Sequence, residues 1–362
     1  MTESAPLRVE GSAKQRGVAL GRAHRDAIVA HLDGLFESWR RSGVSNPQAY
    51  ARDFLAAIDF DPAIDRWAPD LREEIEGLAS GAAIPLDRAW LLQLLDEEWA
   101  YRKSLGFSVR RDKCSAVALR DDAYGACIGQ NMDLGAYTNG FQQLVLHGAP
   151  EQPDQLIFTL AGVIGLLGVN AAGVAVCVNS MPQGGARRQG LPVAFVIRRL
   201  LQERSADAAA DLLFQIDHAT SQHYLIADRQ IIRSLEARPD RVDAITAFAP
   251  GRFFHTNHPL GEAVMLDQQD WKRRNSEARL SALQARLGQG RPDIATLAAA
   301  LASRDDPEHP VCQPLRHSSG NTDFTTGSMI SALRVDGSVS GVWSSGPPAP
   351  GGWRPWSLVV GR

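Results

Sequence analysis

The stretch that decides the fold is DKCSAVALRDDAYGACIGQNMD, residues 112–133. Residues 113–115 open a short apolar run, 116–119, whose length and composition are typical of a strand. Residues 121–125 read as a turn and 126–130 as the returning strand, so the stretch predicts a β-hairpin. Before this hairpin the apolar residues recur at helical spacing, and after it strands alternate with helices.

Helical periodicity runs from Gly17 to about Trp99. Ile28, Leu32, Leu35 and Trp39 recur at intervals of four, three and four, which predicts an amphipathic helix that ends near Ser42 and Gly43. Three more helices are predicted to begin after Pro47, at a capping box formed by Asp70 and Glu73, and after Pro85.

The chain after the hairpin predicts stacked sheets with helices on their outer faces, an α+β class. Further strands are expected over 144–147, 156–160, 174–179, 224–227, 231–235, 329–335 and 339–343. Helices are expected from Pro192, behind a cap at Ser205, over 268–287 and over 293–302.

Composition points to a small-molecule partner. The 38 basic residues nearly balance the 41 acidic ones, so no basic field predicts nucleic-acid binding. The N-terminus lacks the apolar core of a signal peptide, and no run approaches the ~20 apolar residues of a membrane helix. Without paired spacing, the four cysteines predict neither disulfides nor structural zinc: Cys114, Cys127, Cys177 and Cys312. We expect a cytoplasmic protein without a membrane partner.

Cys114 is the candidate nucleophile. It stands at the very start of a strand behind a polar break, whereas Cys127 and Cys177 lie inside predicted strands, where structural cysteines normally pack. Packing alone is the competing interpretation of Cys114.

The residues around Cys114 resemble a known family. Cys114 and Ser115 open a strand, and residues 129–133 follow up to 19 positions later. Further matching segments are 168–179, 256–259 and 326–330, and the last matching residues are Gly346 and Pro347. In this order and spacing they are similar to the N-terminal-nucleophile (Ntn) hydrolases of the isopenicillin N acyltransferase branch. Penicillin V acylases and bile salt hydrolases are more distant relatives.

The resemblance implies a four-layer αββα sandwich and a self-cleaving precursor. The Lys113–Cys114 bond would be cut, leaving residues 1–113 as a helical propiece or α-chain that stays folded onto the catalytic β-chain, 114–362. The new α-amine of Cys114 would be the general base, because it titrates at roughly 7.7 to 8.0 and a thiol near 8.5. The thiolate would then attack an amide carbonyl and form an acyl-enzyme.

The resemblance also assigns roles by position. Asp133 matches the residue that orients the amine and nucleophile. Asn179 matches an asparagine that stabilises the oxyanion together with a backbone N–H. Asn257 matches a second catalytic asparagine, and Arg316 is the nearest candidate for a late arginine. Ordinary structural interpretations also exist for Asp133 and Asn257, as turn residues, and for Asn179, as a strand-end residue.

Two positions depart from the family pattern. Gln130 stands where bile salt hydrolases carry arginine, so the substrate contacts of that branch do not transfer. Lys113 stands where the acyltransferase has glycine, which restricts the backbone at the scissile bond. An uncleaved, non-catalytic binding protein therefore remains an alternative.

The preferred function is hydrolysis of a small N-acyl substrate, with acyl transfer from a thioester such as acyl-CoA to an amine as the alternative. A metal-dependent hydrolase is a third interpretation, using His218 with His223 and His255 with His258, although no carboxylate at helical spacing joins them. Satisfied histidines are the preferred interpretation, and we expect neither a metal nor a cofactor. A homo-oligomer is left open.

Overall fold

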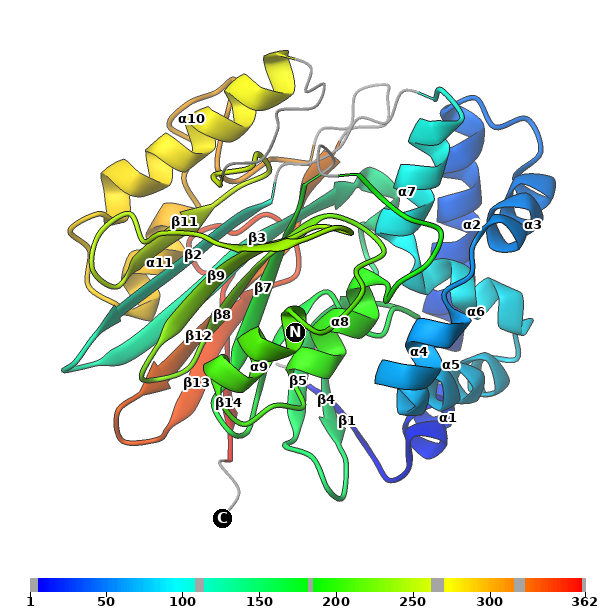
Figure 1. The fold of residues 1–362 in the computed structure, drawn as a ribbon, viewed down its shortest axis with the longest axis horizontal. Helices are drawn as coiled ribbons and strands as arrows, with labels where there is room; N and C mark the ends of the chain where they lie inside the picture. Colours follow the sequence, from blue (N-terminus) through cyan, green and yellow to red (C-terminus); the bar gives the residue numbers. More distant parts are fainter. Residues whose placement is uncertain (1–5, 108–113, 182–184, 262–269, 316–322, 360–362) are drawn as a thin grey trace.

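The computed structural model describes residues 6–107, 114–181, 185–261, 270–315 and 323–359. Lys113 and Arg316 lie outside these residues. Helices α1 to α7, blue to cyan, lie on one side of the strands, and α10 and α11, yellow, lie on the other (Figure 1). None of the described helices is long and apolar enough to cross a membrane.

One sheet of the described residues has eight strands in the order β1-β4-β5-β6-β7-β8-β9-β10. Neighbouring strands are antiparallel except β1 and β4, which are parallel. The strands are β1 (Leu7–Glu10), β4 (Gln142–Gly148), β5 (Gln155–Leu160), β6 (Leu167–Asn170), β7 (Ala175–Ser180), β8 (Gln222–Ala227), β9 (Ile232–Ala237) and β10 (Val242–Ala244).

The second sheet has six strands in the order β11-β2-β3-β12-β13-β14. Its central hairpin pairs Ser115 with Asn131 and closes where Asp121 pairs with Gly125, so the predicted hairpin is confirmed. The strands are β2 (Ser115–Asp121), β3 (Gly125–Gly135), β11 (Arg252–His255), β12 (Asp323–Arg334), β13 (Val339–Ser344) and β14 (Arg354–Leu358).

Seven helices precede the hairpin within the described residues, and four more follow β7. The first group is α1 (Ala13–Ala23), α2 (Arg25–Arg41), α3 (Pro47–Ala57), α4 (Asp61–Trp67), α5 (Pro69–Ala82), α6 (Leu86–Gln93) and α7 (Leu95–Ser104). The second is α8 (Val193–Leu200), α9 (Ala206–Leu213), α10 (Asp270–Leu287) and α11 (Ile294–Leu301).

Two sequence expectations upstream of the hairpin need correction. The segment before residue 113 is not entirely helical, because β1 joins the first sheet beside β4. Asp70 is not a helix cap, because Pro69 already occupies the first helical position and its fixed φ begins α5 one residue earlier. The Asp70 carboxylate instead accepts a hydrogen bond from Gln202 Nε2 at 3.0 Å.

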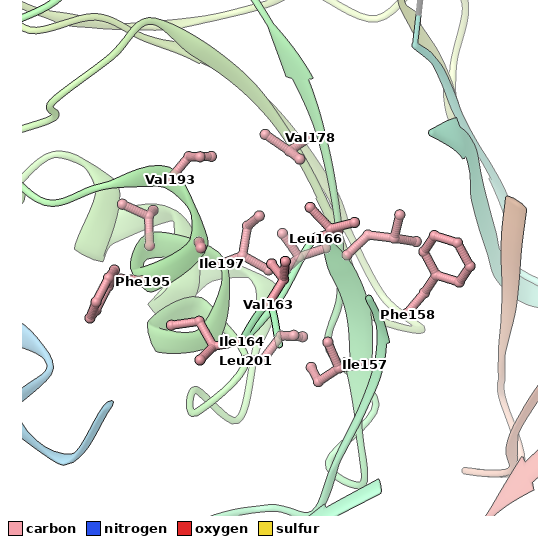
Figure 2. Packing of buried hydrophobic residues seen from close by; sticks show 14 of the residues in the cluster. Ile157, Phe158, Val163, Ile164, Leu166, Val178, Val193, Phe195, Ile197 and Leu201 are labelled. Atoms are coloured by element: carbon pink, nitrogen blue, oxygen red, sulfur yellow. The ribbon is translucent and has the colours of Figure 1, made fainter. Parts of the chain in front are cut away.

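Apolar side chains fill the space on both faces of the sheets. On the outer face of the second sheet, Leu283 of α10 and Leu297 of α11 belong to one buried cluster with Val117 of β2. Figure 2 shows side chains of α8 packed among residues of β7 and of the segment between β5 and β6: Val193, Phe195, Ile197, Val178, Ile164 and Leu166. Between the sheets, the rings of Phe158 and Trp343 lie 6.2 Å apart. The predicted α+β class with N-terminal helices and two sheets is confirmed.

Helices α1 and α5 approach each other at backbone distance. A Cβ atom on Gly17 would lie 1.9 Å from the carbonyl oxygen of Glu74, and one on Gly81 would lie 2.3 Å from that of Val18. Glycine at these two positions allows α1 to pack directly on α5.

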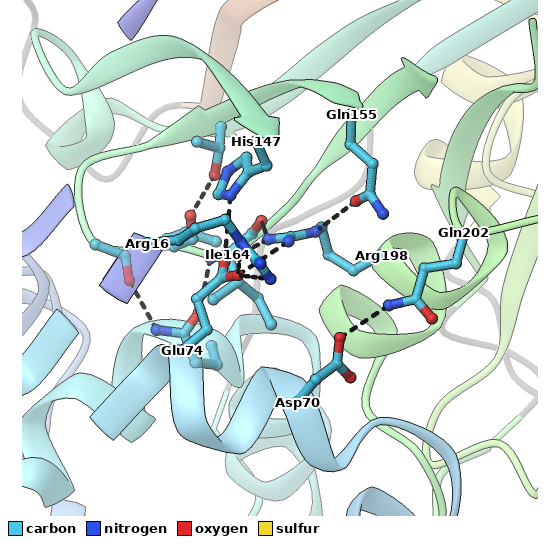
Figure 3. A network of polar contacts seen from close by, with 12 residues as sticks. Arg16, Asp70, Glu74, His147, Gln155, Ile164, Arg198 and Gln202 are labelled. Carbon is cyan, nitrogen blue, oxygen red and sulfur yellow. Dashed lines mark hydrogen bonds and ion pairs between the residues drawn. The ribbon is translucent and has the colours of Figure 1, made fainter. Parts of the chain in front are cut away.

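A buried polar cluster joins the N-terminal helices to the rest of the molecule (Figure 3). Glu74 of α5 pairs with Arg16 of α1 at 3.0 Å and with Arg198 of α8 at 2.7 Å. Burial alone would raise the pKa of Glu74, but the neighbouring positive charges, that of Arg198 first, lower it to about 2. Arg198 also donates from Nε to Gln155 Oε1 at 2.8 Å. A buried ion pair therefore connects an element before residue 113 to an element after it.

Candidate active site

Cys114 lies immediately before β2, and its sulfur faces a cavity. The side chain is 6% exposed, with Sγ 3.8 Å from Met132 Sδ and 3.9 Å from the carbonyl oxygen of Asp133. The cavity has a volume of about 40 Å³. The residues of its wall include Cys114 and Asp133, so the hairpin brings these two predicted residues together.

The wall of the cavity is mainly apolar. Its apolar residues come from α7, β3, the segment between β5 and β6, β7 and α8: Leu95, Trp99, Met132, Leu134, Val163, Leu166, Val178, Val193, Ala194 and Ile197. Its other polar residues are Gln93, Asp96, Ser180 and Gln222. Such a wall suits an apolar group whose carbonyl carbon reaches the sulfur.

Asp96, in the wall of this cavity, has an acidic neighbour in the chain, Glu97. The carboxylate of Asp96 accepts from Gln222 Nε2 at 3.1 Å. The neighbouring Glu97 is buried and accepts hydrogen bonds from the backbone N–H of Val193 at 3.0 Å and from the hydroxyl of Thr220. Burial and the charge of Asp96 raise the pKa of Glu97 to about 8.

Asn257 follows β11 in a loop and is held from several sides. Its Nδ2 donates to the carbonyl oxygen of Ser180, a residue of the cavity wall, at 3.1 Å. Its backbone N–H donates to Ser276 Oγ at 2.8 Å. The structure thus brings Asn257 to the same end of the sheets as the cavity.

Arg279 of α10, which our sequence interpretation did not single out, connects Cys114 to Asn257. This side chain has no exposed surface. Its Nη1 donates to the carbonyl oxygen of Cys114 at 2.6 Å and to Ser115 Oγ at 2.9 Å, and its Nη2 donates to Asn257 Oδ1 at 3.0 Å. One guanidinium therefore fixes the backbone of the candidate nucleophile relative to a predicted catalytic amide.

The side chain of Asn179 is fully buried and is not among the described residues that line the cavity. Its Oδ1 lies 3.1 Å from Nδ1 of His223, its cross-strand neighbour on β8. Asn179 comes directly after Val178, whose backbone N–H donates to Gln130 Oε1 at 2.7 Å. Its predicted role at the oxyanion stays a prediction.

The four histidines considered as metal ligands make protein hydrogen bonds instead. His218 Nε2 bonds the carbonyl oxygen of Leu213 at 3.0 Å, and His258 Nδ1 bonds Ser276 Oγ at 2.7 Å. His223 and His255 stack on each other. Over the described ranges, no three His, Cys, Asp or Glu side chains are grouped so that they could hold a metal ion.

The sequence matches a known family over more than half of its length. The profile described as "Acyl-coenzyme A:6-aminopenicillanic acid acyl-transferase" matches residues 121–333. The chain belongs to this family. The predicted family is therefore confirmed, and the matched range includes Asp133, Asn179, Asn257 and Arg279, whereas Cys114 lies just before it.

A curated member of the family shows the same relationship. The chain is 33% identical over 255 residues to the 40 kDa form of acyl-coenzyme A:6-aminopenicillanic-acid acyltransferase from Emericella nidulans, covering 69% of this chain and 68% of that protein. Two solved structures are also similar. Penicillin V acylase from Agrobacterium tumefaciens has 14% identity and a TM-score of 0.41, covering 64% of this chain and 83% of that one. A mutant of conjugated bile acid hydrolase from Clostridium perfringens has 12% identity and a TM-score of 0.42, covering 68% of this chain and 96% of that one.

The sequence did carry a signal for Arg279 as a buried arginine. Arg279 lies three residues after Ser276 and four before Leu283, on the face of α10 that turns inward. A charge on the buried stripe of a helix needs a partner, and this criterion would have selected Arg279. The residue named from the family pattern, Arg316, lies outside the described residues, as does Lys113.

Proposed function

We propose that the chain is a cysteine Ntn enzyme that forms an acyl-enzyme on Cys114 and hydrolyses the amide bond of a small N-acyl substrate. The observation that supports this most directly is the position of Cys114 Sγ, at the wall of an apolar cavity beside Asp133. Membership of the acyltransferase family also supports acyl-group chemistry.

The proposal includes self-cleavage between Lys113 and Cys114. The sulfur would attack the Lys113 carbonyl carbon, and the peptide bond would give way to a thioester. Water would then hydrolyse the thioester, leaving a carboxylate on residue 113 and a free thiol and α-amine on Cys114. That amine is the base which the mechanism requires.

In turnover, the α-amine would take the thiol proton and the thiolate would attack the substrate carbonyl. The leaving amine would receive that proton, and water would release the acid from the acyl-enzyme. Asn257 and Asn179 are the proposed amide donors to the oxyanion. Removing one such donor typically costs about 2.7 to 4 kcal/mol of transition-state stabilisation.

We further propose that residues 1–113 remain bound to residues 114–362 as one αββα sandwich after cleavage. The pairing of β1 with β4 and the buried contacts of Glu74 with Arg198 both cross this boundary. Separating the fragments would expose these charges and strand edges.

Acyl transfer is the second candidate. The family description and the name of the relative from Emericella nidulans both specify acyl-coenzyme A as donor and 6-aminopenicillanic acid as acceptor. The same acyl-enzyme would serve transfer if an amine, rather than water, reached it.

The test combines mass and activity. The purified wild-type protein should yield two fragments that meet at Cys114 and should release nitroaniline from N-acyl p-nitroanilides with small apolar acyl groups. Cys114→Ala should abolish both processing and turnover. Cys127→Ala is the matched control, because Cys127 is buried in β3 within the cluster beneath α10 and α11. Supplying acyl-CoA with 6-aminopenicillanic acid distinguishes transfer from hydrolysis. Unchanged turnover by Cys114→Ala would rule the proposal out.

A further inference from the structure

Two histidine rings lie stacked between the sheets beside the predicted oxyanion asparagine. His223 of β8 and His255 of β11 have ring centroids 3.6 Å apart and planes 8° apart, and neither side chain is exposed. Because β8 and β11 belong to different sheets, this stack joins the two sheets.

Hydrogen bonds fix the ring of His255. Its Nδ1 lies 2.7 Å from the carbonyl oxygen of Thr256, and its Nε2 lies 3.0 Å from Glu236 Oε1. Burial alone would raise the pKa of Glu236, but hydrogen bonds from His255 and from the backbone of Leu260 and Gly261 lower it. Both ring nitrogens of His255 therefore have a polar partner, and the ring is held between Thr256 and Glu236.

The ring of His223 is neutral. Burial and the neighbouring charge of His255 hold the pKa of His223 well below its ordinary value, so its ring carries one N–H. Nδ1 faces Asn179 Oδ1 at 3.1 Å, and Nε2 faces Ser234 Oγ at 2.8 Å. An amide oxygen can only accept, so the hydrogen lies on Nδ1 and the Ser234 hydroxyl donates to Nε2.

This arrangement leaves the other end of the Asn179 amide available. Its Nδ2 is buried and has no hydrogen-bond partner among the residues that the structure describes. Asn179 directly precedes Ser180, which lines the cavity with Cys114 and accepts a hydrogen bond from Asn257. A buried donor without an acceptor, at this position, suits an oxygen that is present only during the reaction.

We propose that His223 is a positioning residue, whose Nδ1–H holds Asn179 Oδ1 so that Nδ2 donates to the oxyanion formed on Cys114. This inference rests on the proposed function. The two ends of an amide have nearly the same shape, so a fixed donor decides which end faces the substrate. His255 supports His223 from the opposite sheet, and Glu236, on the strand next to His223 in its own sheet, holds His255.

The test compares three variants of His223 with the best p-nitroanilide substrate. His223→Phe keeps a ring but removes the N–H, and should lower kcat by about 10²-fold with KM little changed. His223→Asn keeps a donor near the position of Nδ1 and should restore most of this loss. His223→Gln places its donor toward Ser234 and should not restore it. Equal losses in all three variants would contradict the proposal.

A double-mutant cycle separates positioning from general damage to the fold. Asn179→Ala should lower kcat by about 10²- to 10³-fold, and adding His223→Phe should lower it no further. Additive losses would overturn the proposal. His218→Phe is the matched control, because His218 is a buried histidine that bonds a backbone carbonyl, and its kcat should match the wild type.

A spectroscopic measurement needs no variant that might fail to fold. In the wild-type protein labelled with ¹⁵N-histidine, His223 should be neutral with its hydrogen on Nδ1, and a hydrogen on Nε2 would overturn the proposal. Failure of the proposed function looks different, because Cys114→Ala would then retain wild-type turnover whatever the state of His223.

Discussion

At the scale of single residues, the site depends on a few buried polar contacts around Cys114. The position of Cys114 and Asp133 on one hairpin followed from the local sequence, because a tight hairpin fixes its own register. The contacts of Arg279, His223 and Glu236 could not be predicted this way, because each joins segments far apart in the chain. Cleavage of the Lys113–Cys114 bond stays a prediction.

Arg279 gives the first prediction at this scale. Arg279→Lys keeps the charge but cannot match the planar fork that bridges Cys114 and Asn257, so kcat should fall by about tenfold to a hundredfold. Turnover of the p-nitroanilide substrate measures this effect. Arg274→Lys, an exposed position on the same helix, should leave kcat unchanged. Equal kcat values for the two variants would mean that Arg279 does not position the site.

At the scale of elements, helices with strong periodicity were predicted correctly, whereas short strands were missed. The helix predicted around Ile28–Trp39 is α2, and the helices predicted near residues 268–287 and 293–302 are α10 and α11. The three- and four-residue strands β1, β6, β10 and β11 were missed, because so few residues carry no measurable alternation.

The buried cluster that joins α1, α5 and α8 gives a prediction about elements. Glu74→Gln would leave the Arg16 and Arg198 guanidinium groups buried without their anion, so the free energy of unfolding should fall by about 3 to 5 kcal/mol. Chemical denaturation measures this loss. Asp61→Asn removes a surface partner of Arg72 and should cost no more than about 1 kcal/mol. Similar losses in both variants would argue against the cluster as a major support.

At the scale of the whole molecule, buried neutral histidines make stability depend on pH. Burial, then the charge of Arg198, lowers the pKa of His147 to about 3, against 6.5 when unfolded. The unfolded chain therefore binds a proton below pH 6.5 that the folded chain rejects, and stability is lost as pH falls from 6.5 toward 3. The loss approaches about 1.4 kcal/mol per pH unit from this group.

Comparison with His147→Gln isolates that contribution. Thermal unfolding of both proteins is measured between pH 7 and pH 4. Below about pH 6.5, the wild type should lose stability faster than the variant as the solution is acidified. Parallel pH profiles would mean that His147 is not the group responsible.

The central claim is that Cys114, as the first residue of its own fragment, carries the acyl group. The most direct measurement is mass spectrometry of the wild-type protein quenched during turnover of an N-acyl substrate. We predict two fragments, with the mass of the acyl group added to the peptide that begins at Cys114. A single uncleaved chain that turns substrate over, or an acyl group attached to any other residue, would contradict the account.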